Sequence, residues 1–449
     1  MNQNQLVKLN RWLILASILL VCSVTSNAVL AQGQKWVASW AASAHGPYPS
    51  GNASAQPVLQ YAIESAETGA VDQSFRLIIR PSLWGNRVRL RFSNAFGTQP
   101  VTFDDVFVGL QSSAGNVAVG TNSRVLFRSK RGIAIEPGAV VYSDEIKLDF
   151  VRNASDPLLD GRKLAVSFHI VGNSGPMTWH AKALQTSYLT APRAGSHGGE
   201  ESDASFPFTT TSWYFLDAFE VMASADTAVV VCFGDSITDG TLSTLSGDDR
   251  WPDVLARRLH AAYGNRVSVV NAGIGGNQIT GPAKYSATAP VSGGPSALDR
   301  LERDVLSLSG VTHIIWLEGI NDLSRGASAE AVIAGMRELV KRVRAHGKIK
   351  IIGATITSGV GYNGPAGTDE VNGRRQTVNQ FIRTGGLFDS VADFDAATID
   401  AKTGGLRAEF QPNSTTGGAG DKLHPNRAGY QAMGNAIDLN LLTPKANKK

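Results

Sequence analysis

The chain has 449 residues, and 42 Lys and Arg against 38 Asp and Glu give it a formal net charge of +4. This length allows two domains. Because the small basic excess includes no long basic run, the composition argues against a nucleic-acid-binding protein. It predicts at most a weak attraction to acidic polysaccharides or cell surfaces.

The segment 1–31 is typical of a secretory signal peptide. Lys8 and Arg11 give it a basic start, and residues 12–24 form an apolar stretch that is too short to span a bilayer comfortably. We expect cleavage after Ala31 and export of the mature chain, which would be secreted or periplasmic. We expect no stable membrane insertion after cleavage.

An uncleaved membrane anchor is the alternative for this segment. Lipidation at Cys22 is disfavoured because the bulky Val21 precedes it. Cleavage leaves Cys232 as the single cysteine of the mature chain, so no intrachain disulfide can form and stability must come from core burial. Cys232 lies in an apolar run and is expected to be a buried, inert thiol.

Residues 32–225 read as a β-rich domain, because short alternating runs recur between turn residues. This spacing predicts a β-sandwich or jelly-roll-like domain, with a surface loop over 195–205. The expected strands are 75–79, 87–92, 101–110, 139–142, 163–170 and 213–221.

Residues 226–449 read differently, because apolar strand candidates alternate with amphipathic helices. Such alternation predicts parallel strands joined by right-handed crossovers, in a three-layer α/β/α sandwich. The expected strands are 228–233, 267–271, 313–317, 350–354 and 391–394, and the expected helices are 251–262, 297–307, 328–345, 371–384 and 426–439.

Residues 233–240 read Phe-Gly-Asp-Ser-Ile-Thr-Asp-Gly and directly follow an apolar run. The pattern indicates a buried strand that carries a serine to a tight turn at its carboxyl end, where open parallel sheets bind ligands. Ser236 could be held there as a nucleophile. In the structural alternative, Gly234 and Asp235 make a turn and Ser236 caps a helix.

Two further blocks follow the next two strands. Residues 271–277 read Asn-Ala-Gly-Ile-Gly-Gly-Asn, and these glycines either expose backbone N–H groups to a ligand or form an ordinary turn. The Gly-x-Gly-x-x-Gly spacing of dinucleotide loops is absent. Residues 318–322 read Glu-Gly-Ile-Asn-Asp, in which Asn321 could donate to a developing negative oxygen or simply cap a helix.

The fourth block is Asp421-Lys422-Leu423-His424-Pro425. Asp421 can hydrogen-bond one ring nitrogen of His424 and fix its tautomer, which leaves the other nitrogen free to take a proton from a serine. A lone histidine near a helix start is usually a surface residue, but a carboxylate three residues earlier weakens that alternative. The four blocks together supply a nucleophile, a base, an orienting acid and oxyanion donors.

With these four blocks, residues 226–445 resemble the SGNH or GDSL hydrolase family. The resemblance implies a flavodoxin-like parallel sheet and a catalytic triad of Ser236, His424 and Asp421. The upstream motifs at 36–40 and 91–97 resemble the β-rich extension of one secreted branch of this family.

The resemblance also implies an oxyanion hole, formed by the backbone of Ser236, the backbone of Gly276 and the side chain of Asn321. Gly276 is chosen because the family's glycine ends this block, while Gly273 and Gly275 remain open alternatives. The expected chemistry is cleavage of carboxylic esters through an acyl-enzyme, with no cofactor. The eight histidines show neither His-x-His nor His-Glu-x-x-His spacing, so no catalytic metal is expected.

The segment 278–295 is rich in Gly, Ala, Ser and Thr, and Tyr285 is its one bulky residue. This composition favours short acyl groups on small or polysaccharide esters over the alternative of a lipase or phospholipase, which a long apolar lid would favour. The sequence does not indicate an oligomeric state.

A third reading makes the β-rich half a carbohydrate-binding or adhesion module, with the α/β half as a scaffold. Tryptophans at strand positions are more often core residues than sugar platforms, which weakens this reading. The tryptophans concerned are Trp36, Trp40, Trp84, Trp179 and Trp213.

Overall fold

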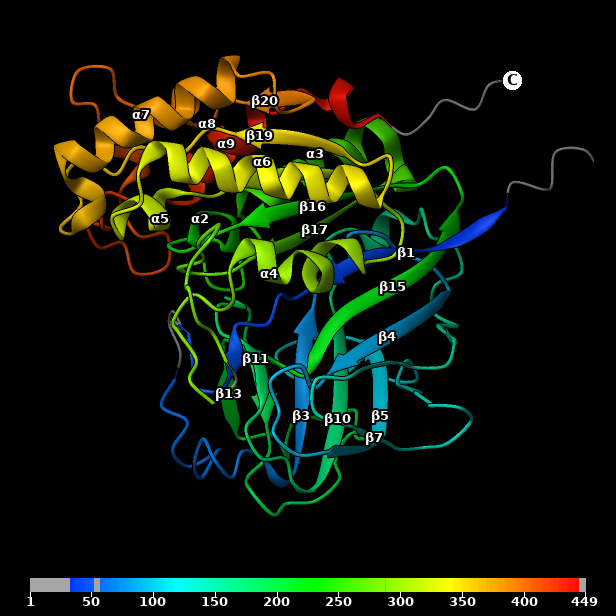
Figure 1. Ribbon diagram of the computed structural model, residues 1–449. Helices are drawn as coiled ribbons and strands as arrows, with labels where there is room; N and C mark the ends of the chain where they lie inside the picture. The colour runs from blue at the N-terminus through cyan, green and yellow to red at the C-terminus, as the bar shows by residue number, and fades with distance from the viewer. Residues whose placement is uncertain (1–32, 52–56, 287, 444–449) are drawn as a thin grey trace, which may run out of the picture.

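The computed structural model describes residues 33–51, 57–286 and 288–443, so the predicted signal peptide lies outside the described residues. Figure 1 shows two halves stacked on each other. The β-rich half (described residues 33–225) contains antiparallel sheets, and the α/β half (described residues 226–443) contains a parallel sheet with helices.

The regular elements of the β-rich half are almost all strands. They are β1 (Gln34–Ala41), β2 (Gly46–Pro47), β3 (Val71–Ile79), β4 (Arg87–Ser93), β5 (Val101–Leu110), β6 (Ser123–Arg124), β7 (Ile133–Ile135), β8 (Val140–Tyr142), β9 (Ile146–Lys147), β10 (Leu164–Asn173), β11 (Thr178–His180), β12 (Ser187–Leu189), β13 (Phe208–Thr210), β14 (Trp213–Tyr214) and β15 (Leu216–Ser224), with the 3₁₀ turn η1 (Pro157–Leu159). One sheet has the order β1-β15-β4-β8, with β9 also paired to β4. The second has the order β13-β12-β3-β10-β5-β6, with β7 paired to β5, and β14-β11-β2 form a small third sheet.

Aromatic side chains join the two larger sheets. Phe92 of β4 lies 5.3 Å from Phe103 of β5 and 5.4 Å from Phe168 of β10, measured between ring centroids. All three rings are fully buried. The sheets therefore pack face to face as the predicted β-sandwich, with the hydrophobic surface of both turned inward.

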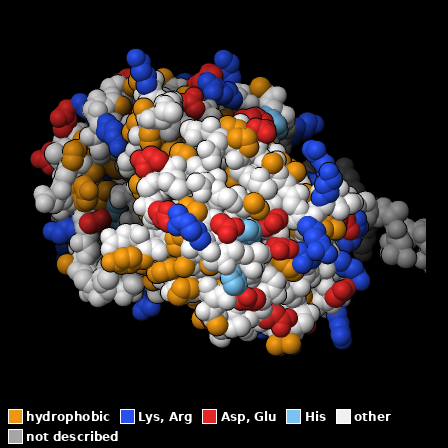
Figure 2. Space-filling model, turned by 90° about the horizontal axis from the view of Figure 1, so that it is seen from below, with side chains coloured by type: hydrophobic (Ala, Val, Ile, Leu, Met, Phe, Trp, Pro, Cys, Tyr) orange, Lys and Arg blue, Asp and Glu red, His pale blue; other side chains and the backbone are white. Residues whose placement is uncertain are grey.

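Most of the tryptophans considered as sugar platforms belong to this core. Trp40, Trp84, Trp179 and Trp213 are 7, 8, 2 and 6% exposed, so the reading that they form an exposed stacking surface is wrong for these four. On the face seen in Figure 2, which looks onto the β-rich end of the molecule, hydrophobic side chains lie in small groups among charged ones of both signs.

The α/β half alternates strands and helices as predicted. Its elements are β16 (Ala228–Gly234), α2 (Ser236–Asp239), α3 (Trp251–Tyr263), η2 (Gly264–Arg266), β17 (Val267–Gly273), α4 (Ala297–Leu301), η3 (Glu302–Leu306), β18 (Val311–Leu317), α5 (Ile320–Ser324), α6 (Ala329–His346), β19 (Lys350–Ala354), η4 (Pro365–Gly367), α7 (Asp369–Thr384), β20 (Ser390–Ala392), α8 (Phe394–Thr398), η5 (Ala408–Phe410), α9 (Arg427–Asn435) and η6 (Leu439–Leu442). None of the described helices combines the length and the hydropathy needed to cross a membrane.

The five strands of this half are all parallel, in the order β17-β16-β18-β19-β20. In chain order this is 2-1-3-4-5, the flavodoxin-like arrangement. Val229 and Val231 of β16 belong to a core cluster with α4, α6 and α7, whereas Val230 and Cys232 belong to a cluster with α3, α8 and α9. Helices thus cover both faces, which explains why β16 is apolar throughout.

Several predicted elements differ in extent. The expected strand 213–221 is divided into β14 and β15, which belong to different sheets. The expected strand 391–394 is β20 (Ser390–Ala392), because Asp393 caps α8 by accepting from the Ala396 N–H, which makes Phe394 the first helical residue. The expected helix 297–307 changes to a π-helical turn at Glu302. The expected helix 426–439 ends at Asn435.

The β-rich half directly covers the edge of the parallel sheet. The Ser268 hydroxyl in β17 donates to the Ala38 carbonyl of β1 over 2.6 Å, and the Val269 N–H donates to the Ser82 hydroxyl over 2.8 Å. Val37 of β1 and Val270 of β17 belong to the same hydrophobic cluster. The unpaired edge of β17 is therefore protected by the first half of the chain.

Candidate active site

Ser236 sits where the sequence predicted, immediately beyond the carboxyl end of β16. Asp235 caps the short helix α2 by accepting from the Ile237 N–H over 3.0 Å, so Ser236 is its first residue. Gly234 is required just before it, because a Cβ there would lie 2.2 Å from the Leu317 carbonyl of β18. The cap is thus Asp235, and the Ser236 side chain is left for another contact.

The Ser236 hydroxyl makes that contact with His424. Ser236 Oγ lies 2.8 Å from His424 Nε2, and His424 Nδ1 lies 2.6 Å from Asp421 Oδ2. The other carboxylate oxygen, Asp421 Oδ1, accepts from the His424 and Leu423 N–H groups over 2.9 and 3.0 Å. In this arrangement Nδ1 carries the proton shared with Asp421, and Nε2 is oriented to accept the serine proton.

The electrostatics of Asp421 suit this role. Partial burial acts to raise its pKa, but the hydrogen bond and the charge of His424, together with the backbone donors, outweigh burial and lower the pKa to about 2. Asp421 is therefore a carboxylate at neutral pH and can stabilise an imidazolium beside it.

The glycine block supplies one N–H group with no protein acceptor. The Gly273 N–H donates to Asn271 Oδ1 and the Gly275 N–H donates to Asp239 Oδ2, each over 2.8 Å. The Gly276 N–H, in contrast, finds no acceptor among the described residues. Of the three glycines considered from the sequence, Gly276 is the one whose N–H is left for a ligand.

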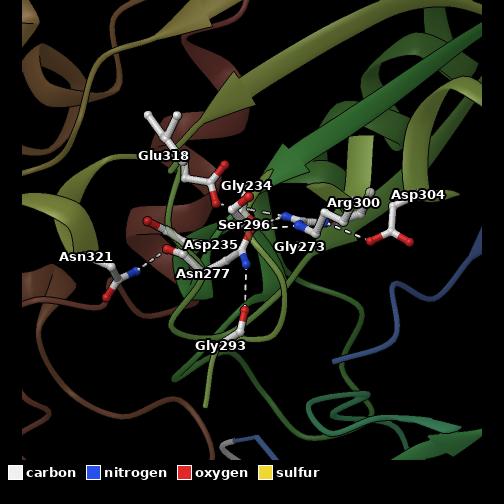
Figure 3. A network of polar contacts seen from close by, with 12 residues as sticks. Gly234, Asp235, Gly273, Asn277, Gly293, Ser296, Arg300, Asp304, Glu318 and Asn321 are labelled. Atoms are coloured by element: carbon white, nitrogen blue, oxygen red, sulfur yellow. Dashed lines mark hydrogen bonds and ion pairs between the residues drawn. The ribbon is translucent and has the colours of Figure 1, made fainter. Parts of the chain in front are cut away.

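Two further donors complete this group. The N–H of Ser236 has no intrahelical acceptor, because it stands at the start of a helix. Asn321, in the first turn of α5, donates one amide hydrogen to the Asn277 carbonyl over 2.9 Å, and its second amide hydrogen donates to no described residue. Figure 3 shows this contact between α5 and the glycine block.

The β-rich half reaches this site through β11 and the residues after it. His180 Nε2 lies 3.2 Å from Asp239 Oδ1, and the buried Lys182 Nζ donates to Thr241 Oγ1 over 2.8 Å. Burial lowers the pKa of Lys182, although three carboxylates, at Asp239, Asp421 and Asp235, oppose the shift. Lys182 could not be predicted as a site residue, because a single lysine in a β-rich segment gives no signal in the sequence.

Buried acids around the site stabilise turns. Asp239 holds the Gly275 N–H, and Asp322 accepts from the N–H groups of Ile279 and Thr280 over 2.9 and 3.2 Å. Burial raises the pKa of Asp235 to about 7. Among the described residues, His, Cys, Asp and Glu side chains form no cluster of three suited to a metal ion.

Arg300 and Asn277 connect the strand ends to Asn321, and the sequence did not predict this role for either residue. Arg300 could have been recognised together with Asp304. Arg300 and Asp304 are four residues apart and share a face with the buried Leu301 and Val305. Charged residues on the apolar face of a helix are the signal that could have marked them.

A serine, a histidine and an aspartate hydrogen-bonded at the carboxyl edge of a parallel sheet form the arrangement of a serine hydrolase. Residues 232–432 match the family model described as GDSL-like lipase/acylhydrolase, and the C-terminal half of the chain belongs to this family. No curated protein sequence matches the chain.

Solved structures of known proteins resemble the chain over about half its length. A lipase/acylhydrolase from Enterococcus faecalis is 24% identical, covers 49% of this chain and 99% of its own, and has a TM-score of 0.35. An aryl esterase from M. smegmatis is 18% identical. The match covers 48% of this chain and 100% of the esterase, with a TM-score of 0.36. A carbohydrate acetylesterase family member from Sinorhizobium meliloti is 17% identical. The match covers 48% of this chain and 97% of that protein, with a TM-score of 0.36.

Proposed function

We propose that the protein hydrolyses carboxylic esters, with Ser236 as the nucleophile, His424 as the general base and Asp421 as the residue that orients the imidazole. The observation that carries this proposal is the unbroken chain of two short hydrogen bonds from Ser236 Oγ through the His424 ring to Asp421. Such a chain activates a hydroxyl that is otherwise a weak nucleophile at neutral pH.

In the first step Ser236 Oγ attacks the ester carbonyl carbon while its proton passes to His424 Nε2. The N–H groups of Ser236 and Gly276 and the side-chain amide of Asn321 stabilise the resulting oxyanion. The C–O bond of the ester then breaks, and the alcohol leaves with the proton from His424. Water activated by His424 attacks the acyl-enzyme, which releases the acid and restores Ser236.

For the substrate we propose short acyl groups on small polar molecules or polysaccharides. Among its described residues, the segment 278–295 forms no helix, so it offers no helical apolar lid. Its bulky residue, Tyr285, is turned toward the β-rich half, where its hydroxyl donates to the His45 carbonyl over 2.6 Å and its ring packs against Phe96.

A panel of nitrophenyl esters tests both parts of the proposal, with purified mature protein and the variant Ser236→Ala as the control. We expect acetate to be cleaved faster than palmitate, and the control to lose nearly all turnover. Faster cleavage of palmitate would leave an ester hydrolase but replace the short-chain preference with the lipase alternative. Equal activity of the control would overturn the role of Ser236.

We also propose that the enzyme acts outside the cytoplasm, after removal of residues 1–31. The basic start and the apolar stretch of that segment support this proposal. Sequencing the N-terminus of protein recovered from the medium or the periplasm tests it, with Gln32 as the expected first residue. Recovery of the full-length chain from the membrane fraction would favour the uncleaved anchor.

A further inference from the structure

A buried arginine ties together the ends of the two strands that carry the site. Arg300 of α4 is 1% exposed, and its Nη2 donates to the Gly234 carbonyl at the end of β16 over 2.8 Å. Its Nη1 donates to the Ala272 carbonyl of β17 over 2.8 Å, and its Nε donates to Asn277 Oδ1 over 2.7 Å. Figure 3 shows the guanidinium at the centre of these contacts.

Asn277 extends this network to the side chain proposed to bind the oxyanion. Its amide nitrogen donates to the carbonyls of Gly293 and Pro295 over 2.6 and 2.7 Å, and its backbone carbonyl accepts from Asn321 over 2.9 Å. Because Asn277 is fully buried and held at both ends, its position sets where Asn321 lies.

The position of Asn277 also determines the direction of the Gly276 N–H. The Asn277 N–H donates to the Ile274 carbonyl over 3.1 Å, which closes a turn whose central residues are Gly275 and Gly276. The φ of +84° at Gly276 is that of a type II turn. Type I and type II turns differ by a flip of the central peptide, and this flip would point the Gly276 N–H away from its present direction.

Partners on all sides oppose that flip. Asp239 accepts from the Gly275 N–H, and Arg325 Nη1 donates to the Gly276 carbonyl over 3.3 Å. Arg300 holds the end of the turn through Asn277 Oδ1, and its rigid planar guanidinium donates at the same time to the Gly234 and Ala272 carbonyls.

The network continues into the β-rich half. Asp304 accepts from Arg300 over 3.2 Å and from Arg303 Nε over 2.6 Å. Arg303 in turn donates to the Ala44 carbonyl over 2.8 Å. Through Asp304 and Arg303, contacts from both halves of the molecule thus fix the position of Arg300.

We propose that Arg300 is a positioning residue for the oxyanion hole: by holding Asn277 it fixes the turn that presents the Gly276 N–H and the carbonyl that places Asn321. This inference rests on the ester hydrolysis proposed above. Arg300 acts through its neighbours and does not touch the reacting atoms.

The test compares two lysine substitutions of buried arginines. Arg300→Lys keeps the charge but cannot reach three acceptors, so we expect kcat to fall roughly 10- to 100-fold with little change in KM, because a displaced oxyanion donor weakens transition-state binding.

The matched control is Arg375→Lys. Arg375 is also 1% exposed, and it pairs with Asp395 and the Ile356 carbonyl at α7. This control should lose stability but keep kcat within about twofold, because it lies outside the network. Equal losses of kcat in both variants would overturn the proposal.

Two further measurements keep the test decisive if Arg300→Lys folds poorly. Asn277→Asp retains the acceptor for Arg300 but places an oxygen against the Gly293 and Pro295 carbonyls, and it should lower kcat about 10-fold or more. Asn321→Ala should cost less in the Arg300→Lys background than in the wild type, because the oxyanion hole is already displaced there. Wild-type kcat for Asn277→Asp, or full additivity of the double variant, contradicts the positioning role. Full activity of Ser236→Ala would instead overturn the proposed function itself.

Discussion

His180 and Asp239 face each other across the junction of the two halves, with Nε2 and Oδ1 3.2 Å apart. Both side chains are buried, and the other oxygen of Asp239 accepts from the Gly275 N–H. Burial acts to raise the pKa of Asp239, but its interaction with His180, together with the charges of His45 and Lys182, outweighs burial and lowers that pKa. The β-rich half therefore reaches the glycine turn beside Ser236 through Asp239, and the Lys182 side chain also lies against Gly275.

His180→Phe should lower both stability and turnover. Phe retains the stacking of the ring on Trp213 but leaves Asp239 buried without this partner, which costs about 1–3 kcal/mol in the free energy of unfolding. We expect kcat to fall about 10-fold because the turn shifts. His169→Phe is the control, since His169 contacts Asp72 and Asp104 within the β-rich half. Urea unfolding measures the stability of both variants, and ester kinetics measures their turnover. The prediction would be contradicted if both variants kept the wild-type kcat.

Asn321→Ala should lower kcat roughly 10²- to 10³-fold, with a much smaller effect on KM, because the lost donor acts mainly on the developing oxyanion. The matched control is Asn94→Ala. Asn94 is a buried asparagine whose amide donates to the Gln99 and Ile135 carbonyls, in the β-rich half. Steady-state kinetics of both variants would remove Asn321 from the proposed hole if its kcat stayed close to that of the control.

Asp421→Asn should lower kcat about 10³- to 10⁴-fold. An amide can donate toward His424 Nδ1, which would place the ring proton on Nε2 and leave no acceptor for the Ser236 hydroxyl. Circular dichroism should show an unchanged fold. Activity within tenfold of the wild type would show that the carboxylate does not set the tautomer.

The same carboxylate should stabilise the fold in a pH-dependent way. The pKa of Asp421 falls from its ordinary 3.8 to about 2 in the folded protein, so the folded state binds this proton less tightly than the unfolded state does. Its stabilising contribution is present above pH 3.8 and is lost as the pH falls toward 2. The difference in unfolding free energy between the wild type and Asp421→Asn should therefore shrink over this range. A constant difference from pH 5 to pH 2 would exclude this linkage.

Glu318 should have the opposite effect on stability. Burial raises its pKa from 4.5 to about 8, against the opposing charge of Arg300, and within the described part of the chain its Oε1 has no hydrogen-bond partner. The folded state thus binds this proton more tightly than the unfolded state, and stability is lost as the pH rises from 4.5 to about 8. In Glu318→Gln the free energy of unfolding should fall less over this pH range. The stability of the variant relative to the wild type should therefore be higher at pH 8 than at pH 5. Urea midpoints that run parallel for both proteins from pH 5 to pH 9 would contradict it.

The sequence predicted the parallel sheet well because its signals are local. Residues 228–233 are apolar throughout, and Asp421 and His424 lie three residues apart, so both patterns can be read without knowing their neighbours. The structure brings Ser236, His424 and Asp421 into hydrogen-bonding contact, as the four blocks predicted, while their catalytic roles stay predictions.

What the sequence did not predict depends on contacts between distant segments. No strand was expected over residues 34–41, because β1 owes its burial to β15 and β17 rather than to an alternating pattern of its own. Of the four groups that accept from Arg300, two are the backbone carbonyls of Gly234 and Ala272, which leave no trace in the amino-acid pattern. From the sequence, His180 could reach the site or serve a structural role, and its contact with Asp239 appears only in the fold.

The shared hydrophobic cluster of β1 and β17 links the evolution of the two halves. A larger side chain at Val37 would need a smaller one at a site of that cluster packed against it, so substitutions on the two sides of the junction should compensate each other. If the two halves were produced as separate chains, divided between residues 225 and 226, each would expose apolar surface. Activity should return only when the two fragments are produced together.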